Sequence, residues 1–131
     1  MIELWLPVKD YEGLYEVSNM GNVRSVARVE TFSRIGKETH RIKAGRILKP
    51  VIRDEYLGVC LSKGKTRKCY LIHRLVAEAF LINPMNYPQV NHKDEDKYNN
   101  KAENLEWCTA LYNNNYGRRN ENISKSNKRR M

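Results

Sequence analysis

Apolar residues in the first 72 positions recur mostly at every second residue, in short runs that turn residues separate. Such alternation is typical of half-buried antiparallel strands. From His73 the spacing changes to steps of three and four residues and stops at Asn83-Pro84, which predicts one helix of about ten residues. A chain with this change of period is expected to fold as an α+β protein with an antiparallel, β-rich N-terminal region.

Within the β-rich region the sequence predicts a small meander over residues 5–29, with a turn at 19–22, and further strands at 46–50, 56–61 and 68–72. Residues 62–65 join the last two strands as a turn rich in cations. Residues 33–45 are polar and contain Gly, so we expect a mobile connection or an irregular hairpin there.

After Pro84 the pattern predicts a strand at 89–92, a long polar loop, a strand at 104–108 and a short helix that Thr109 caps. The residues expected in the core of this unit are apolar or small: Val90, Leu105, Trp107, Cys108 and Leu111. We divide the chain into a β-rich basic region (1–72), a helix with this strand–strand–helix unit (73–116) and a weakly ordered basic tail (117–131).

Several classes of protein are excluded or disfavoured by composition. The apolar stretches fall far short of the roughly 20 residues that cross a bilayer, so we expect no membrane-spanning helix. The N-terminal residues lack the positive charge and small-residue cleavage site of a secretory signal, so we expect a cytoplasmic protein. The three cysteines, Cys60, Cys69 and Cys108, are odd in number and include no CxxC motif, so we expect them to be reduced and mostly buried.

The net charge of +9 is unevenly distributed along the chain. Residues 31–80 carry 12 Lys and Arg against 4 Asp and Glu, and residues 117–131 carry 6 against 1. Residues 81–116, in contrast, carry 3 against 5. Two basic blocks on either side of a nearly neutral segment suit a polyanion such as nucleic acid, although a charge excess that serves only solubility remains the alternative.

Three blocks in the second half carry a family resemblance: Asn91-His92, Asn104-Leu105-Glu106-Trp107, and the helix ending near Asn113. With the upstream segment 11–25 and the helix from His73, they resemble the HNH endonucleases, specifically the homing type that phages and introns encode. The segment 11–25 resembles the small N-terminal module often fused to such domains. The resemblance implies a ββα-metal (His-Me finger) motif, a gene of phage or prophage origin and a bacterial host cell.

The resemblance also implies roles for individual residues. His92 would be the general base that activates water, and Asn104 would brace the loop between the strands. Asn91 and Asn113 would hold one divalent cation, Mg²⁺ or Mn²⁺, through their amide oxygens; the spacing of nine residues from Asn104 favours Asn113 over the asparagines that follow it. Asn99 and Asn100 are interpreted as turn residues.

Position 91 is Asn, where homing enzymes of this family often carry Asp. Neither Asn91 nor Asn113 brings negative charge, so we expect weak metal affinity without DNA, with the scissile phosphate supplying the missing charge. The expected partner is double-stranded DNA, bound by a monomer or a homodimer without a small-molecule cofactor. Candidate phosphate contacts are the cations of the basic blocks: Arg24, Arg34, Lys37, Arg41, Lys43, Arg46, Lys63, Lys65, Arg67, Lys68, Arg118 and Arg119.

Two other classes of function compete with a nuclease. A catalytically inactive protein that keeps the HNH fold would bind DNA without cutting it. An RNA-binding module is the weaker alternative, because the eight Tyr are scattered along the chain and form no recognisable stacking platform.

Overall fold

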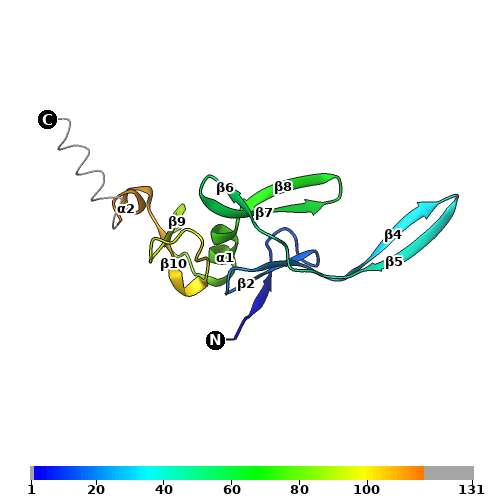
Figure 1. Cartoon of the computed structure of the whole chain (residues 1–131), viewed down its shortest axis with the longest axis horizontal. Helices are drawn as coiled ribbons and strands as arrows, with labels where there is room; N and C mark the ends of the chain where they lie inside the picture. Colours follow the sequence, from blue (N-terminus) through cyan, green and yellow to red (C-terminus); the bar gives the residue numbers. More distant parts are fainter. Residues whose placement is uncertain (1, 117–131) are drawn as a thin grey trace.

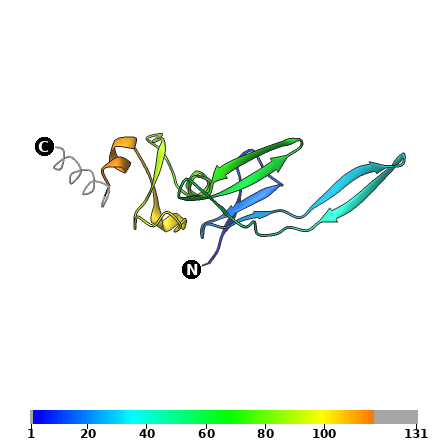
Figure 2. The same cartoon turned by 45° about the horizontal axis from the view of Figure 1, so that its top comes forward.

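The computed structural model describes residues 2–116, which form an elongated α+β protein. A long hairpin of β4 and β5 projects at one end in both views, and β9, β10 and α2 lie at the other end (Figures 1 and 2). Between them lie two small sheets and the helix α1. The strands are β1 (Trp5–Pro7), β2 (Tyr15–Ser18), β3 (Val23–Ser25), β4 (Arg28–Arg34), β5 (Lys37–Lys43), β6 (Val51–Arg53), β7 (Tyr56–Lys63), β8 (Thr66–Leu71), β9 (Gln89–His92) and β10 (Leu105–Cys108). The helices are α1 (Ile72–Phe80), the 3₁₀ turn η1 (Ala102–Asn104) and α2 (Ala110–Asn114).

The first sheet is the predicted meander, in the antiparallel order β1-β2-β3. Val17 and Val23 face each other across β2 and β3, and both are buried. The connecting turn is held by the hydroxyl of Ser18, which accepts hydrogen bonds from the backbone N–H groups of Met20 and Asn22. Gly21 lies in this turn with φ +89°, a left-handed conformation that glycine adopts without steric cost.

The second sheet, β6-β7-β8, packs with α1 over a common core. Helix α1 directs one face inward, where Leu75 and Val76 meet Val59 and Leu61 of β7. This helix confirms the predicted change of period, and it begins at Ile72, one residue earlier than expected. The same buried cluster extends from Val8 to Leu105, so side chains of the N-terminal sheet and of the C-terminal unit share it.

None of the helices in the described part of the chain is long and apolar enough to cross a membrane.

The segment expected to be a mobile connection or an irregular hairpin is part of a regular hairpin, formed by β4 and β5. Seven consecutive residue pairs, from Arg28–Lys43 to Arg34–Lys37, give it regular antiparallel pairing. Every residue of β5 is exposed, so neither face needs apolar residues and the alternation that reveals other strands is absent. Ile35 and Gly36 both have positive φ, as a two-residue type I′ hairpin turn requires.

The strand predicted at 46–50 is wrong. Ile47 forms one isolated bridge with Arg24, and the next sheet strand begins only at Val51. A Pro at position 50 has no N–H for a ladder hydrogen bond, which explains why regular pairing starts after it.

The C-terminal unit has the predicted order of strand, loop, strand and helix. β9 and β10 pair antiparallel, with Leu105 opposite His92 and Cys108 opposite Gln89. Thr109 caps α2 as predicted, because its hydroxyl accepts a hydrogen bond from the N–H of Tyr112 at 3.1 Å. The core prediction for Leu111 is wrong, since its side chain is 72% exposed.

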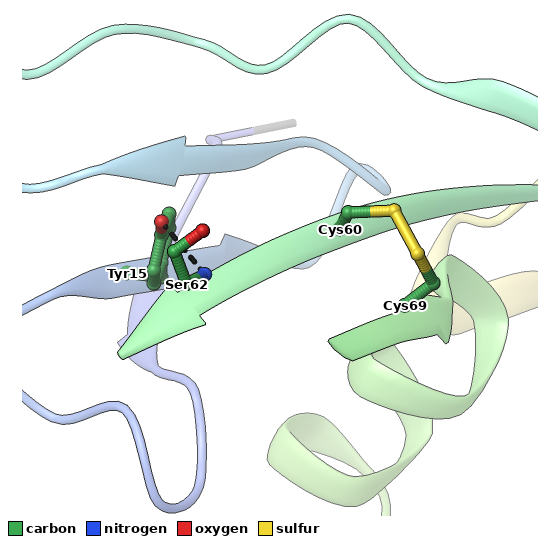
Figure 3. The surroundings of a disulfide bond; sticks show 4 residues. All are labelled: Tyr15, Cys60, Ser62 and Cys69. Carbon is green, nitrogen blue, oxygen red and sulfur yellow. Dashed lines mark hydrogen bonds between the residues drawn. A yellow bond between two sulfur atoms is a disulfide. The ribbon is translucent and has the colours of Figure 1, made fainter. Parts of the chain in front are cut away.

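The prediction that all three cysteines are reduced is also wrong. Cys60 on β7 and Cys69 on β8 are direct cross-strand partners and form a disulfide (Figure 3). Beside it, the backbone N–H of Ser62 donates to the hydroxyl of Tyr15, which ties β7 to the first sheet (Figure 3). The spacing of nine residues has no disulfide signature, and the pairing follows from the hairpin register. Cys108 is buried and takes no part in a disulfide, as predicted.

The disulfide predicts a stability that depends on redox conditions. Closing a loop of nine residues should stabilise the oxidised protein by about 2–3 kcal/mol relative to the reduced one. We expect urea unfolding to require more denaturant without reductant than with it, and the double variant Cys60→Ala/Cys69→Ala to lose this difference. Labelling of three thiols in the unfolded, air-oxidised protein, rather than of Cys108 alone, would contradict the pairing.

Candidate active site

The side chain of Asn104 fixes the loop between β9 and β10. Its amide nitrogen donates to the carboxylate of Asp94 and to the carbonyl of Asn99, both at 2.9 Å. Its amide oxygen accepts from the N–H of Asp94 at 3.1 Å, and its backbone carbonyl accepts from Lys93. A buried amide that uses both ends in this way holds the two sides of the loop at a fixed separation.

Asp94 is stabilised as a carboxylate within the same loop. Hydrogen bonds from the side chain of Asn99, from the N–H of Asp96 and from Asn104 lower its pKa below the ordinary value. Asp94 therefore remains ionised near neutral pH and serves as an acceptor inside the loop.

His92 lies at the end of β9, just before this loop, and its side chain is 5% exposed. Its Nε2 lies 2.8 Å from Oδ1 of Asn100, which is itself buried. An amide oxygen only accepts, so Nε2 carries the proton and the lone pair of the neutral ring lies on Nδ1. The rings of Tyr56 and His73 pack against the imidazole, with centroids 5.9 and 4.9 Å away.

His73 is the neutral neighbour of His92. Burial, followed by the positive charge of His92 when protonated and by Arg74, lowers the pKa of His73 to about 3. Its Nδ1 is buried and has no hydrogen-bond partner among the residues that the structure describes. His73 is therefore uncharged near neutral pH and packs as an aromatic residue against the rings of Tyr56 and His92.

The two candidate metal ligands, Asn91 of β9 and Asn113 of α2, are held by hydrogen bonds to the two strands. The amide nitrogen of Asn91 donates to Oε1 of Glu106 at 2.9 Å, and that of Asn113 donates to Oε1 of Gln89 at the same distance. Helix α2 thus lies against β9 through Asn113, while Glu106 stands directly opposite Asn91 on β10. A hydrogen bond with Glu106 also raises the pKa of Tyr112.

These residues fit a hard divalent cation. The amide nitrogen of Asn91 is bound to Glu106, so its oxygen, the atom that Mg²⁺ or Mn²⁺ prefers, lies on the other side of the amide. The carboxylate of Glu106 places one negative charge next to Asn91. Residues 2–116 contain no group of three or more His, Cys, Asp and Glu side chains arranged around a metal position, so a cation here depends on amide oxygens, water and substrate.

The candidate DNA contacts are spread along the molecule. Lys37, Arg41 and Lys43 lie on the exposed β5 strand, and Arg34 lies in β4, although its side chain is outside the described ones. The four cations of the β7–β8 hairpin lie around its turn or on its strands: Lys63, Lys65, Arg67 and Lys68. Arg46 is exposed in the segment before β6. Arg118 and Arg119 lie outside the described residues.

Arg24 is engaged within the protein. Its guanidinium forms an ion pair with Glu16 at 2.7 Å and lies 4.0 Å from the centre of the Trp5 ring. Lys63 is similarly bound, since its ammonium group donates to the carbonyl of Asp10. Either side chain would have to break these contacts before it could bind a phosphate with all of its N–H donors.

Sequence reasoning missed two residues of this site. Asn100, interpreted as a turn residue, is the partner of His92, and Glu106 is the partner of Asn91. Alternation along β9 and β10 places Glu106 on the face of Asn91 once the register is known, but no signal in the sequence gives that register. Asn100 reaches His92 across an irregular loop, where spacing carries no geometric information.

Known proteins match the chain over nearly its whole length. Residues 3–62 match the family description "NUMOD4 motif". The chain is 38% identical over 125 residues to DNA endonuclease I-HmuI of Bacillus phage SP01, covering 93% of this chain and 63% of that protein. It is 35% identical over 116 residues to an uncharacterised HNH endonuclease of Acanthamoeba polyphaga mimivirus, covering 88% of this chain and 30% of the relative.

A solved structure agrees with these matches. It concerns DNA binding and cleavage by the HNH homing endonuclease I-HmuI, and superposes on this chain with a TM-score of 0.71 at 35% identity. The match covers 95% of this chain and 64% of the other, so the chain spans somewhat less than two thirds of the relative's length. By sequence and by fold, the chain belongs to the HNH homing endonuclease family.

Proposed function

We propose that this protein is a DNA endonuclease of HNH type, in which His92 is the general base of a metal-dependent phosphodiester hydrolysis. The hydrogen bond from Nε2 of His92 to Oδ1 of Asn100, at 2.8 Å, is the observation that carries the proposal. A general base has to present a lone pair in a fixed direction, and this bond selects the tautomer with that lone pair on Nδ1. The relative I-HmuI, described as binding and cleaving DNA, supports the same reaction.

In the proposed mechanism, Nδ1 of His92 takes a proton from a water molecule. The resulting hydroxide oxygen attacks phosphorus, the bond to the 3′ oxygen breaks, and the leaving oxygen takes up a proton from solvent. The products are a 5′-phosphate and a 3′-hydroxyl. A divalent cation supplies charge stabilisation at the phosphate and leaving oxygen when bound. Asn104 acts indirectly, because it holds the loop that carries Asn100.

We further propose that Asn91 and Asn113 hold one Mg²⁺ or Mn²⁺, in a ββα-metal motif formed by β9, β10 and α2. Glu106 compensates for the absence of Asp at position 91, because its carboxylate is bound to the Asn91 amide. The negative charge thus lies on the hydrogen-bond partner of the ligand and not on the ligand itself. This arrangement supports weak metal binding until a phosphate completes the site.

Double-stranded DNA is the proposed substrate. The β4–β5 hairpin supports this choice, since it projects from the body and exposes Lys37, Arg41 and Lys43 along one strand (Figure 1). A narrow, twisted two-stranded ribbon has the dimensions of a DNA groove, and its cations would meet phosphates on either side.

One observation favours the alternative of a DNA-binding protein without turnover. His92 is 5% exposed, so a water molecule has little room to approach the ring in the DNA-free protein. Binding of supercoiled DNA without any strand cleavage, in the presence of Mg²⁺ or Mn²⁺, would establish this alternative.

The first prediction concerns the general base. His92→Ala should lower the rate of nicking of a supercoiled plasmid with Mg²⁺ or Mn²⁺ by about 10²–10⁴-fold, because a positioned proton acceptor contributes that much. DNA affinity, measured in EDTA, should stay unchanged. His40→Ala, on the exposed hairpin, is the matched control and should cut at the wild-type rate once DNA is saturating. A His92→Ala protein that still nicks normally would exclude His92 as the base.

The second prediction concerns the charge beside the metal ligands. Glu106→Gln should weaken Mn²⁺ binding by roughly ten-fold or more, because the partner of a ligand orients it and sets the local charge. The affinity is measured by the electron paramagnetic resonance signal of free Mn²⁺, with and without DNA. Glu103→Gln, an exposed carboxylate on η1, is the control and should bind as wild type. Equal affinities in both variants would show that Glu106 has no part in the site.

The third prediction concerns salt. If Lys37 and Lys43 bind phosphates, Lys37→Gln/Lys43→Gln should reduce the slope of log affinity against log salt by about 0.9 for each phosphate that is no longer neutralised. Lys9→Gln, an exposed lysine in the acidic N-terminal part, should leave the slope unchanged. A slope that is the same in all three proteins would place the DNA elsewhere.

A further inference from the structure

We propose that the β2–β3 turn of the N-terminal sheet positions the general base: Gly21 seats Asn100, and Asn100 in turn fixes the tautomer of His92. This inference rests on the proposed function and deepens it. Residues 3–62, which match the NUMOD4 motif, would then contribute to the geometry of the nuclease centre as well as to the fold. Gly21 is a positioning residue in this proposal, since it touches neither DNA nor the reacting atoms.

The contact between the turn and the loop is close at Gly21. A Cβ atom placed there would lie 3.0 Å from both Cβ and the backbone oxygen of Asn100. Carbon atoms in proteins pack at about 3.5–4.0 Å, so a residue with a side chain could not occupy position 21 unless Asn100 moved. The glycine is therefore required by its neighbour as well as by its φ of +89°.

The contacts on either side of Asn100 oppose the displacement that a Cβ atom at position 21 would cause. The carbonyl of Asn19, in the same turn, accepts a hydrogen bond at 2.8 Å from the N–H of Ala102, two residues beyond Asn100. On the other side lie His92 and the loop that Asn104 braces through the carbonyl of Asn99. Asn100 and His92 are both buried, so the space around them is filled.

Hydrogen bonds within the β2–β3 turn hold Gly21 in a fixed position relative to the first sheet. Besides the two N–H groups whose hydrogen bonds it accepts, the hydroxyl of Ser18 donates to the carboxylate of Glu3 at 2.7 Å. The N–H of Gly21 donates to the carbonyl of Ser18. Because Ser18 ends β2, this network fixes the turn to the first sheet and fixes the first sheet relative to Asn100.

A displaced Asn100 would change catalysis without changing DNA binding. If Oδ1 moves away from Nε2, the neutral imidazole of His92 no longer has one preferred tautomer, and part of the population presents N–H instead of a lone pair to water. The cations proposed to meet DNA, Lys37, Arg41 and Lys43, lie on β5, which is not part of this turn. The expected signature is a lower kcat with unchanged affinity for DNA.

The test compares Gly21→Ala with Gly13→Ala. Gly13 has φ +80°, so alanine meets the same backbone strain there, but its added Cβ would have no atom within 4 Å. We expect Gly21→Ala to lower kcat for plasmid nicking by about ten- to a hundred-fold, the effect of misplacing a catalytic group. Its affinity for DNA in EDTA should stay within about two-fold of wild type, and Gly13→Ala should match wild type in both measurements.

A second readout does not depend on cleavage. Long-range ¹H–¹⁵N NMR of the histidine rings at pH 8 distinguishes the two neutral tautomers. We expect His92 to be protonated on Nε2 in wild type and in Gly13→Ala, and to show a mixture in Gly21→Ala. Wild-type protein that cuts no DNA would refute the proposed function, whereas the tautomer comparison would still decide this inference.

Two further variants keep the test decisive. Gly21→Ala should add nothing to the loss of kcat in Asn100→Ala, because both act through the same bond. If Gly21→Ala fails to fold, Ser18→Ala loosens the turn without adding an atom and should produce the same mixture of tautomers. An unchanged His92 tautomer in a folded Gly21→Ala or Ser18→Ala protein, or equal losses of kcat in Gly21→Ala and Gly13→Ala, would overturn the proposal.

Discussion

The hydrogen bond between His92 and Asn100 is the interaction around which the C-terminal unit is organised. A buried imidazole and a buried amide are each costly unless they are paired, and together they satisfy one another. The pairing requires a loop that returns to the end of β9 after eight residues, and Asn104 holds that loop closed. The loop places Oδ1 of Asn100 next to Nε2 of His92, and this hydrogen bond favours the tautomer that is protonated on Nε2.

The second histidine of the site, His73, lies against the ring of His92 without adding charge. His73 is neutral because burial lowers its pKa to about 3, so it adds no positive charge next to His92. Its unpartnered Nδ1 carries an energetic cost that a phenyl or aliphatic side chain would avoid. Glu106 is hydrogen-bonded to Asn91 and brings a carboxylate next to this proposed metal ligand.

The sequence was sufficient where one face of an element is buried. The helix after Leu71 was predicted because burial of one face imposes a period on its residues. The cap at Thr109 was predicted from its hydroxyl, since α2 has no buried residue. The strands 89–92 and 104–108 were also predicted, although burial does not alternate along them. The regular pairing of the β4–β5 hairpin was not predicted, because every residue of β5 is exposed and no period results. The Cys60–Cys69 pair and the Glu106–Asn91 pair depend on strand register, which side-chain chemistry alone does not determine. Asn100 and Gly21 meet across 79 positions, a proximity that no local pattern encodes.

The basic β4–β5 hairpin lies at one end of the molecule, and β9 and α2, which carry the proposed metal ligands, lie at the other (Figure 1). This separation limits the electrostatic effect of the hairpin on the proposed metal site. Screening at physiological ionic strength reduces the field of a charge over about 8 Å. The cations of β5 can hold a duplex through its phosphates in the proposed complex, but they cannot neutralise the negative charge of Glu106 or of a phosphate near Asn91 and Asn113. In the proposed metal site, charge balance would therefore be local, set by Glu106, the cation and the scissile phosphate. Two neutral ligands suit such a local charge balance. A carboxylate at position 91 would lie next to the carboxylate of Glu106, and the two negative charges would repel each other in the absence of a cation and DNA.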